Sequence, residues 1–327
     1  KFHYPMNYVL LIVGLVLILG GANYLTDGAA AIARKFGLSD LIVGLTIVAF
    51  GTSAPELTIS VMSAVDGNTG MAIGNVVGSN IFNTLLIIGA VALARPIHIG
   101  KGIMVNEIPL VILASVAILA MGCSPWLDGT PAEISRVNGI LLLLFFVIFM
   151  RYIFSQAGES KHEQPGQPAE AKPQPRMWLS AIMVVGGLAA LIYGGDLFVD
   201  KASAIARSWG VSDAIIGLTI VAAGTSLPEL ATSLVAAVKG NSGIAVGNVI
   251  GSNIFNIFLV LGCAAAVRPL PFGGISMLDL GVLTGSALMF WFFGWFFKTR
   301  TITRIEGAIM ALCYILYITF LVIQANA

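Results

Sequence analysis

Residues Gly44–Leu57 read GLTIVAFGTSAPEL, and residues Gly217–Leu230 read GLTIVAAGTSLPEL. A second motif also occurs twice, as GNVVGSNIFN over Gly74–Asn83 and as GNVIGSNIFN over Gly247–Asn256. The two copies of each motif lie 173 residues apart, and 21 of the 24 motif positions are identical. The chain is therefore an internal duplication, and its repeats decide the fold.

The composition around these motifs is typical of a membrane protein. Of the 327 residues, 57% are hydrophobic and 10% are charged, against roughly 25% charged residues in soluble domains. The fold class that we predict is an all-α integral membrane protein in the lipid bilayer. Apolar runs predict ten transmembrane helices, at residues 6–26, 41–65, 69–94, 103–122, 137–154, 177–199, 214–238, 243–267, 276–297 and 305–324.

The spans divide into two halves. Residues 1–154 form the first five-helix repeat, residues 155–176 a polar cytoplasmic linker, and residues 177–327 the second repeat. Because each repeat has an odd number of spans, the second copy enters the membrane from the opposite side, so the repeats are inverted. With both termini outside, twelve Lys and Arg residues lie inside and five outside. The positive-inside rule thus predicts that orientation, in the cell membrane.

Several classes of function find no support in the sequence. The net charge is +1 and no basic cluster with interleaved aromatic residues occurs, so we expect no nucleic-acid partner. The three cysteines, Cys123, Cys263 and Cys313, lie in or beside apolar stretches and are typical of small buried hydrophobes. Outside the two repeated glutamates, no nucleophile or acid–base pair suggests an enzyme. We expect neither a prosthetic group nor an obligate protein partner.

Each GTS motif places one carboxylate, Glu56 or Glu229, near the middle of an otherwise uncharged span. An ionised carboxylate there costs about 2.5–3.5 kcal/mol on insertion scales, so two of them need a compensating partner. A bound cation would supply it. The alternative, a proton-holding or structural carboxyl, is weakened by the duplication among hydroxyl-bearing residues.

Oxygen-bearing side chains surround both glutamates at helical spacing. Thr52 and Ser53 precede Glu56 by four and three residues, and Thr225 and Ser226 precede Glu229 in the same way. The GN motifs add a second wall with residues four apart, Ser79 with Asn83 and Ser252 with Asn256. Hard oxygen ligands suit Ca²⁺ or Na⁺ better than soft transition metals.

The prolines that precede the glutamates bear on the backbone of the same site. Pro55 and Pro228 each remove one helical hydrogen bond, which frees backbone carbonyls beside the carboxylates. The alternative for each Ser and Thr hydroxyl, taken singly, is that it only satisfies this kinked backbone.

The remaining polar residues have simpler readings. The other asparagines of the GN motifs are as well suited to interhelical hydrogen bonds as to ligation, and we leave them out of the site: Asn75, Asn80, Asn248 and Asn253. Asp27, Asp196 and Asp200 lie toward span ends, where snorkelling or solvation is expected. We also expect solvated flanks at Asp66, Glu107, Glu133, Asp279 and Glu306.

The paired GTSAPE/GTSLPE and GNVVGSNIFN/GNVIGSNIFN motifs resemble the two alpha-repeats of the calcium/cation antiporter superfamily, nearest to its sodium/calcium exchanger branch in a prokaryotic form. The resemblance implies that Glu56 and Glu229 are the central Ca²⁺ ligands. It implies flanking Ca²⁺ and Na⁺ ligands at Thr52, Ser53, Ser79, Thr225, Ser226, Ser252, the carbonyls of Ala49 and Ala222, and the side chain of Asn83. It also implies that the first and sixth spans slide across the other eight.

Two departures refine this expectation. Potassium-dependent relatives carry an acidic residue where this chain has Asn256, so the resemblance implies no K⁺ co-transport. Proton-coupled relatives carry a glutamate within the GN motif, where this chain has Gly78 and Gly251. Our hypothesis is a Na⁺/Ca²⁺ antiporter with alternating access at one site for which the two ions compete. The alternatives are a Ca²⁺/H⁺ antiporter, a cation channel with a glutamate filter, and a scaffold that binds no cation.

Overall fold

The structure is a computed structural model, which describes residues 3–160, 176–210, 216, 220, 222–297 and 300–326. The described chain is helical apart from two short two-stranded sheets. The first half contains α1 (His3–Phe36), α2 (Asp40–Val43), η1 (Gly44–Val48), α3 (Ala49–Thr52), α4 (Ala54–Val65), α5 (Thr69–Ile81), η2 (Phe82–Ile87), α6 (Ile88–Ala94), η3 (Ile103–Glu107), α7 (Ile108–Gly122), α8 (Ser124–Leu127) and α9 (Arg136–Ser160). The second half contains α10 (Met177–Ser208), α12 (Ala222–Gly224), α13 (Leu227–Val238), α14 (Ser242–Ile254), η5 (Phe255–Leu261), α15 (Gly262–Val267), α16 (Met277–Phe296) and α17 (Arg304–Asn326).

Among the described residues, eight helices are long and apolar enough to cross a membrane, and the bent pair 40–52 and 54–65 would make a ninth. These correspond to nine of the ten spans predicted from the sequence. The remaining predicted span, 214–238, runs partly through residues outside the described set, and α13 is its described apolar end. The protein is thus a multi-pass membrane protein, while the number ten stays a prediction. Most of the predicted linker, residues 161–175, also lies outside the described residues.

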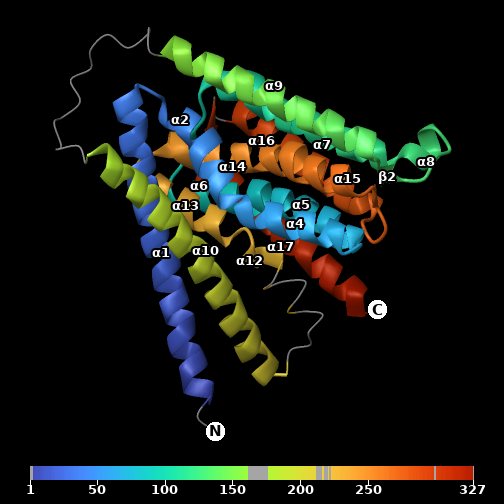
Figure 1. Ribbon diagram of the computed structural model, residues 1–327, viewed down its shortest axis with the longest axis horizontal. Coiled ribbons are helices and arrows are strands. Elements are labelled where there is room, and N and C mark those ends of the chain that lie inside the picture. Colours follow the sequence, from blue (N-terminus) through green and yellow to red (C-terminus); the bar gives the residue numbers. More distant parts are fainter. Residues whose placement is uncertain are drawn as a thin grey trace.

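The helices α1 and α10 lie side by side along one side of the bundle (Figure 1). Both continue well beyond the predicted spans, to Phe36 and Ser208. Glycines let the two backbones approach closely: a Cβ added at Gly21 would lie 2.6 Å from the carbonyl oxygen of Gly187. Such contacts between small residues are a common basis of helix association in membranes.

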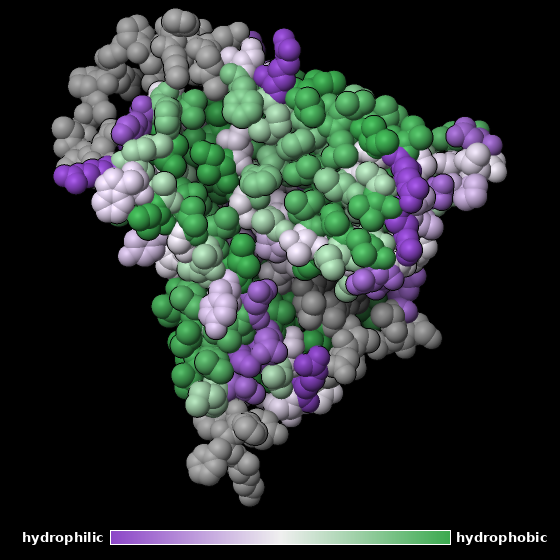
Figure 2. All heavy atoms as spheres, viewed as in Figure 1, coloured by the Kyte–Doolittle hydropathy of each residue, from purple (hydrophilic) through white to green (hydrophobic). Residues whose placement is uncertain are grey.

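The two GN motifs lie on the most deeply buried spans, which run from α5 to α6 and from α14 to α15. The helix α14 packs against α2 and η1 of the opposite half, and α5 packs against α4 of its own half. The peripheral helices α1, α9, α10 and α17 expose many large apolar side chains. In the space-filling view, hydrophobic residues cover much of the visible face, while hydrophilic ones lie along its margins and in a group in its lower part (Figure 2). An apolar outer surface is what a bilayer requires.

Short strands join loops of the two halves. β1 (Ile97–His98) pairs antiparallel with β4 (Thr301–Ile302), and β2 (Glu133–Ile134) pairs antiparallel with β3 (Leu270–Pro271). In each pair, one strand comes from the first half of the chain and the other from the second half. The sequence carries no signal for these strands, because each is only two residues long.

The expectation that the flanking carboxylates are solvated is wrong for three of them: Glu107, Asp279 and Glu306 are at most 8% exposed. Glu107 accepts a hydrogen bond of 2.7 Å from the Tyr152 hydroxyl. Asp279 forms a capping box with Ser276 and accepts a 2.7 Å hydrogen bond from the hydroxyl of Tyr317. Glu306 accepts a 2.8 Å hydrogen bond from the Thr303 N–H. In each case, a donor from a neighbouring helix or turn compensates the desolvation of the acid.

Candidate functional site

A break in each GTS motif positions the two repeated glutamates. The helix α3 ends at Thr52, α4 begins at Ala54, and the two segments are bent by 46°. Pro55 occupies the first turn of α4 and Glu56 follows it. The expectation that Pro55 removes a helical hydrogen bond is wrong, because the helix is already interrupted at Ser53 and an N–H in a first turn has no helical partner. The second half repeats the pattern with Pro228 and Glu229 in the first turn of α13. Both carboxylates therefore lie at helix N-termini, whose dipole favours negative charge.

Serines from both halves hold the two carboxylates, which are 0% exposed. Ser226 of the second half donates to Glu56 Oε1 over 3.2 Å, and Ser53 of the first half donates to Glu229 Oε1 over 3.1 Å. Each glutamate also accepts a longer bond from its own half, from Ser79 at 3.5 Å and from Ser252 at 3.4 Å. The duplicated motifs thus form one polar cluster, in which each half donates a hydrogen bond to the glutamate of the other half.

One oxygen of each carboxylate remains available. Glu56 Oε2 and Glu229 Oε2 are buried and have no hydrogen-bond partner within the described structure. A buried acceptor without a donor is costly. Two such oxygens, on acids already held in place through Oε1, are suited to a cation.

Threonine and asparagine side chains form a supporting shell. Thr52 Oγ1 donates to Asn248 Oδ1 over 3.1 Å, and the Asn248 amide donates to Ser233 Oγ and to the Glu229 carbonyl, over 3.0 and 3.3 Å. The first half mirrors this arrangement with Thr225, Asn75, Ser60 and Glu56. Asn75 and Asn248 are not among the ligands predicted from the sequence. They fix the glutamate-bearing turns from the opposite wall, a role that motif spacing alone does not distinguish from ordinary helix contacts.

The remaining predicted ligands are Asn83, Asn256 and the carbonyls of Ala49 and Ala222. Asn83 and Asn256 are fully buried; neither amide atom of Asn83 has a partner in the described structure, and Asn256 donates to Asn80 Oδ1 over 3.0 Å. The Ala49 carbonyl already accepts a 3.0 Å bond from the Ser53 N–H. Ala222 begins α12. The interhelical role considered for Asn80 holds, because its amide donates to the Asn253 carbonyl.

A pocket of about 330 Å³ reaches the cluster from one side. Its walls include Asp196 and Val199 of α10, and Thr225 and Pro228 beside Glu229. Thr225 is partly exposed, whereas its counterpart Thr52 is 0% exposed. Among the described residues, the cluster is therefore more accessible beside Thr225 than beside Thr52.

The chemistry of the cluster suits a hard cation. Two carboxylates, four serine and two threonine hydroxyls and two asparagine amides supply oxygen atoms. Within the described residues, no group of three or more His, Cys, Asp or Glu side chains could hold a metal. Ligand sets of carboxylate, hydroxyl and amide oxygens are those of calcium and sodium.

A family model described as "Sodium/calcium exchanger protein" matches residues 6–155 and 179–323. The putative antiporter CaxA of Alkalimonas amylolytica is 39% identical over 94% of this chain and 96% of its own length. The sodium/calcium exchanger MaX1 of Methanosarcina acetivorans is 30% identical over 97% of this chain and 98% of its own. A solved structure of the sodium-calcium exchanger NCX_Mj, soaked with Na⁺ and Ca²⁺, superposes with a TM-score of 0.81 at 31% identity, covering 96% of this chain and 98% of that one.

Proposed function

Because the chain belongs to the sodium/calcium exchanger family, we propose that it exchanges Na⁺ for Ca²⁺ across the membrane at the cluster around Glu56 and Glu229. The relatives named above are described as exchangers or antiporters, so the family supports cation antiport rather than catalysis. Calcium and sodium are then substrates, and no prosthetic group is needed. The specific step of the proposal is the choice of Na⁺ as the counter-ion and of these residues as the site.

The observation that carries the proposal is the shared cluster itself. Each of the two buried carboxylates accepts a hydrogen bond from a serine of the other half and keeps one oxygen without a partner. A divalent cation bound there cancels both charges, and Na⁺ ions that take the same oxygens exclude it. Competition for one set of ligands couples the two fluxes, because occupancy by one ion prevents occupancy by the other.

The proposed ligands are those expected from the sequence. Glu56 and Glu229 are central, with Thr52, Ser53, Ser79, Asn83, Thr225, Ser226, Ser252, Asn256 and the carbonyls of Ala49 and Ala222 around them. The hydrogen bonds to the two glutamates, two between the halves and two within a half, support the four serines most directly.

The proposed topology has ten spans in two inverted repeats, 1–154 and 177–327, joined by the cytoplasmic linker 155–176. Both termini would face outside in the cell membrane. The matching breaks before Glu56 and Glu229 support this arrangement, since interrupted helices in equivalent repeats are typical of midplane transport sites. Access that alternates between the two sides of such a site needs no second binding site.

The test is ⁴⁵Ca²⁺ uptake into proteoliposomes loaded with Na⁺, K⁺ or choline. We expect uptake from Na⁺-loaded vesicles only, and loss of uptake in Glu56→Gln and in Glu229→Gln. Glu107→Gln is the matched control, because Glu107 is also a buried carboxylate but bonds to Tyr152 outside the cluster. Uptake should persist in that variant.

Other outcomes would point to the alternative functions. Uptake driven by a pH gradient without Na⁺ would indicate a Ca²⁺/H⁺ antiporter. Flux that needs no counter-ion would indicate a channel. Equal uptake by the parent and both glutamate variants would exclude the proposed site.

A further inference from the structure

The two passages that could lead to the cluster differ in this conformation. Each wall residue of the open pocket has a counterpart at the equivalent position of the other half, 173 residues away in the sequence. Ile59, Val199 and Ser203 line the pocket beside α10. Their counterparts are Thr232, Thr26 and Ala30.

The counterpart passage beside α1 is closed. Thr26 and Thr232 are 0% exposed and Ala30 is 3% exposed. The helix α1 packs directly against α13, whereas the pocket separates α10 from residues of α4. The hydroxyls of Thr26 and Thr232 have no hydrogen-bond partner in the described structure. Buried hydroxyls without partners are unfavourable in a permanent interface, and they suit a wall that becomes hydrated when the passage opens.

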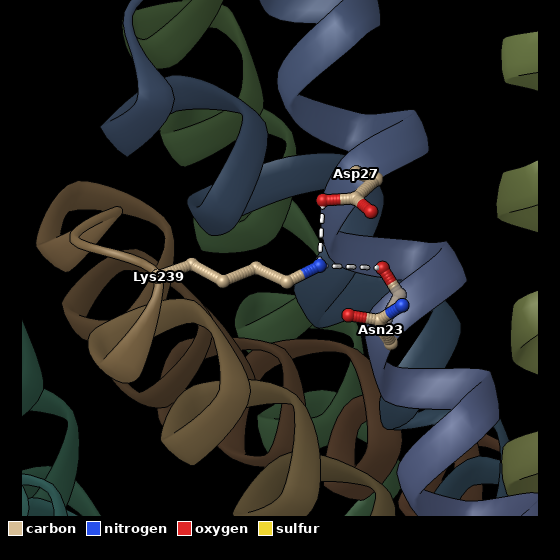
Figure 3. Close-up of polar contacts among 3 residues, drawn as sticks. All are labelled: Asn23, Asp27 and Lys239. Atoms are coloured by element: carbon tan, nitrogen blue, oxygen red, sulfur yellow. Dashed lines mark hydrogen bonds and ion pairs between the residues drawn. The ribbon is translucent and has the colours of Figure 1, made fainter.

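A single lysine spans the closed passage. Lys239, which caps the C-terminal end of α13, places Nζ 2.6 Å from Asp27 Oδ1 and 3.3 Å from the Asn23 carbonyl oxygen, both on α1 (Figure 3). Asp27 and Asn23 are the counterparts of Asp200 and Asp196, which line the open pocket. The ion pair therefore ties α1 to α13 at the positions that would have to separate.

The other passage lacks the means to form this ion pair. The counterpart of Lys239 is Asp66, and the counterpart of Asp27 is Asp200, so the two positions carry like charges. Asp200 instead pairs with its neighbour Lys201 at 2.6 Å. Closing α10 onto α4 would bring Asp200 toward Asp66, which costs energy rather than releasing it.

We propose that Lys239 and Asp27 form a one-sided latch that holds the passage beside α1 closed and so favours the conformation open beside α10. This inference rests on alternating access, as part of the proposed function. Lys239 is a positioning residue: it touches no transported ion, and it acts on the position of α1. Both partners are partly exposed, with 27% and 47% of their side chains accessible, so the latch shifts an equilibrium without locking it. Pairs of this kind change a population ratio by roughly 1.5- to 5-fold.

The test uses thiol accessibility in protein whose Cys123, Cys263 and Cys313 are replaced by alanine. Thr26→Cys reports on the closed passage and its counterpart Val199→Cys on the open pocket. A charged methanethiosulfonate reagent is applied in buffer without Na⁺ or Ca²⁺. In Lys239→Met, we expect the modification rate at Thr26→Cys to rise by roughly 1.5- to 5-fold and the rate at Val199→Cys to fall.

Two further variants separate a latch from general loosening. The charge exchange Asp27→Lys with Lys239→Asp should return both rates to the parent values. Asp66→Lys should create a pair with Asp200 and move both rates as Lys239→Met does, because it favours closure beside α10. A rise at both thiols, unchanged rates in Lys239→Met, or no restoration by the exchange would overturn the latch.

The accessibility assay is independent of the transported ions. If Na⁺-loaded vesicles show no Ca²⁺ uptake while the two thiol rates shift in opposite directions, the proposed exchange fails and the latch stands. If uptake depends on Na⁺ while the rates do not shift, the exchange stands and the latch fails.

Discussion

Two adjacent glycines on α1 allow a sharp test of the α1–α10 contact. A Cβ at Gly21 would lie 2.6 Å from the Gly187 carbonyl oxygen and 2.8 Å from the Leu191 nitrogen, both backbone atoms that cannot rotate away. A Cβ at Gly20 would meet no atom within 4 Å. The two substitutions to alanine are chemically the same, and they differ only in the face of the helix that receives the methyl group.

Two opposing contributions to the free energy of unfolding, helix propensity and overpacking, set the expected effects. Alanine favours a helix over glycine by about 0.8–1 kcal/mol, which both variants gain. Overpacking a tight contact costs about 1–3 kcal/mol, which only Gly21→Ala incurs. We therefore expect Gly20→Ala to be as stable as the parent or slightly more so. Gly21→Ala should be less stable than Gly20→Ala by about 1–3 kcal/mol.

The measurement is the thermal unfolding midpoint of the purified variants in one detergent. The opposite helix offers an independent repeat, because a Cβ at Gly187 would lie 2.6 Å from the Leu25 nitrogen while one at Gly186 meets nothing within 4 Å. We expect the same order for Gly187→Ala and Gly186→Ala. Equal midpoints within both pairs would refute close backbone contact between α1 and α10.

Three further predictions concern single polar contacts. Ser53→Ala and Ser226→Ala each remove a cross-half donor to a glutamate, so Ca²⁺ uptake at limiting Ca²⁺ should fall by about tenfold or more in both, as expected for a hydrogen bond to a charged group. Asn256→Asp adds a third negative charge to the cluster, which favours a divalent over a monovalent ion; the Na⁺ concentration that half-inhibits ⁴⁵Ca²⁺ uptake should rise. Tyr317→Phe leaves Asp279 without one donor and should lower the free energy of unfolding by about 1–3 kcal/mol, seen as a lower thermal midpoint than that of Tyr314→Phe on the same helix.

Much of the site could be predicted because the duplication marks it. The repeated carboxylates, hydroxyls and asparagines stand out from an apolar chain, and the structure gathers them into one cluster. The spacing of the residues does not show which hydroxyl donates a hydrogen bond to which glutamate. Helical periodicity groups Ser53 with Glu56, but the bend at Ser53 turns its hydroxyl to Glu229 of the other half. That pairing depends on how the halves dock, which no local pattern encodes.

The buried flanking acids show a second limit of sequence reasoning. Glu107 and Asp279 lie at predicted span ends, where solvation is the default. Their partners, Tyr152 and Tyr317, are 45 and 38 residues away in the chain. A carboxylate near the end of a span is therefore predictable as buried only once the helix that covers it is known.

The two halves differ in sequence along the passages but not at the proposed ligand positions. The proposed ligand positions are the same in both halves: Thr, Ser and Glu in the GTS motifs, and Ser and Asn in the GN motifs. The equivalent positions of the two passages differ: Thr26 corresponds to Val199, Thr232 to Ile59, and Lys239 to Asp66. In the proposed mechanism, one central site must present the same oxygens to an ion that arrives from either side. Each passage, in contrast, meets one compartment only, so its polarity and its charges are free to differ. An ion pair that closes one passage can therefore bias the conformation without altering the site that both passages serve.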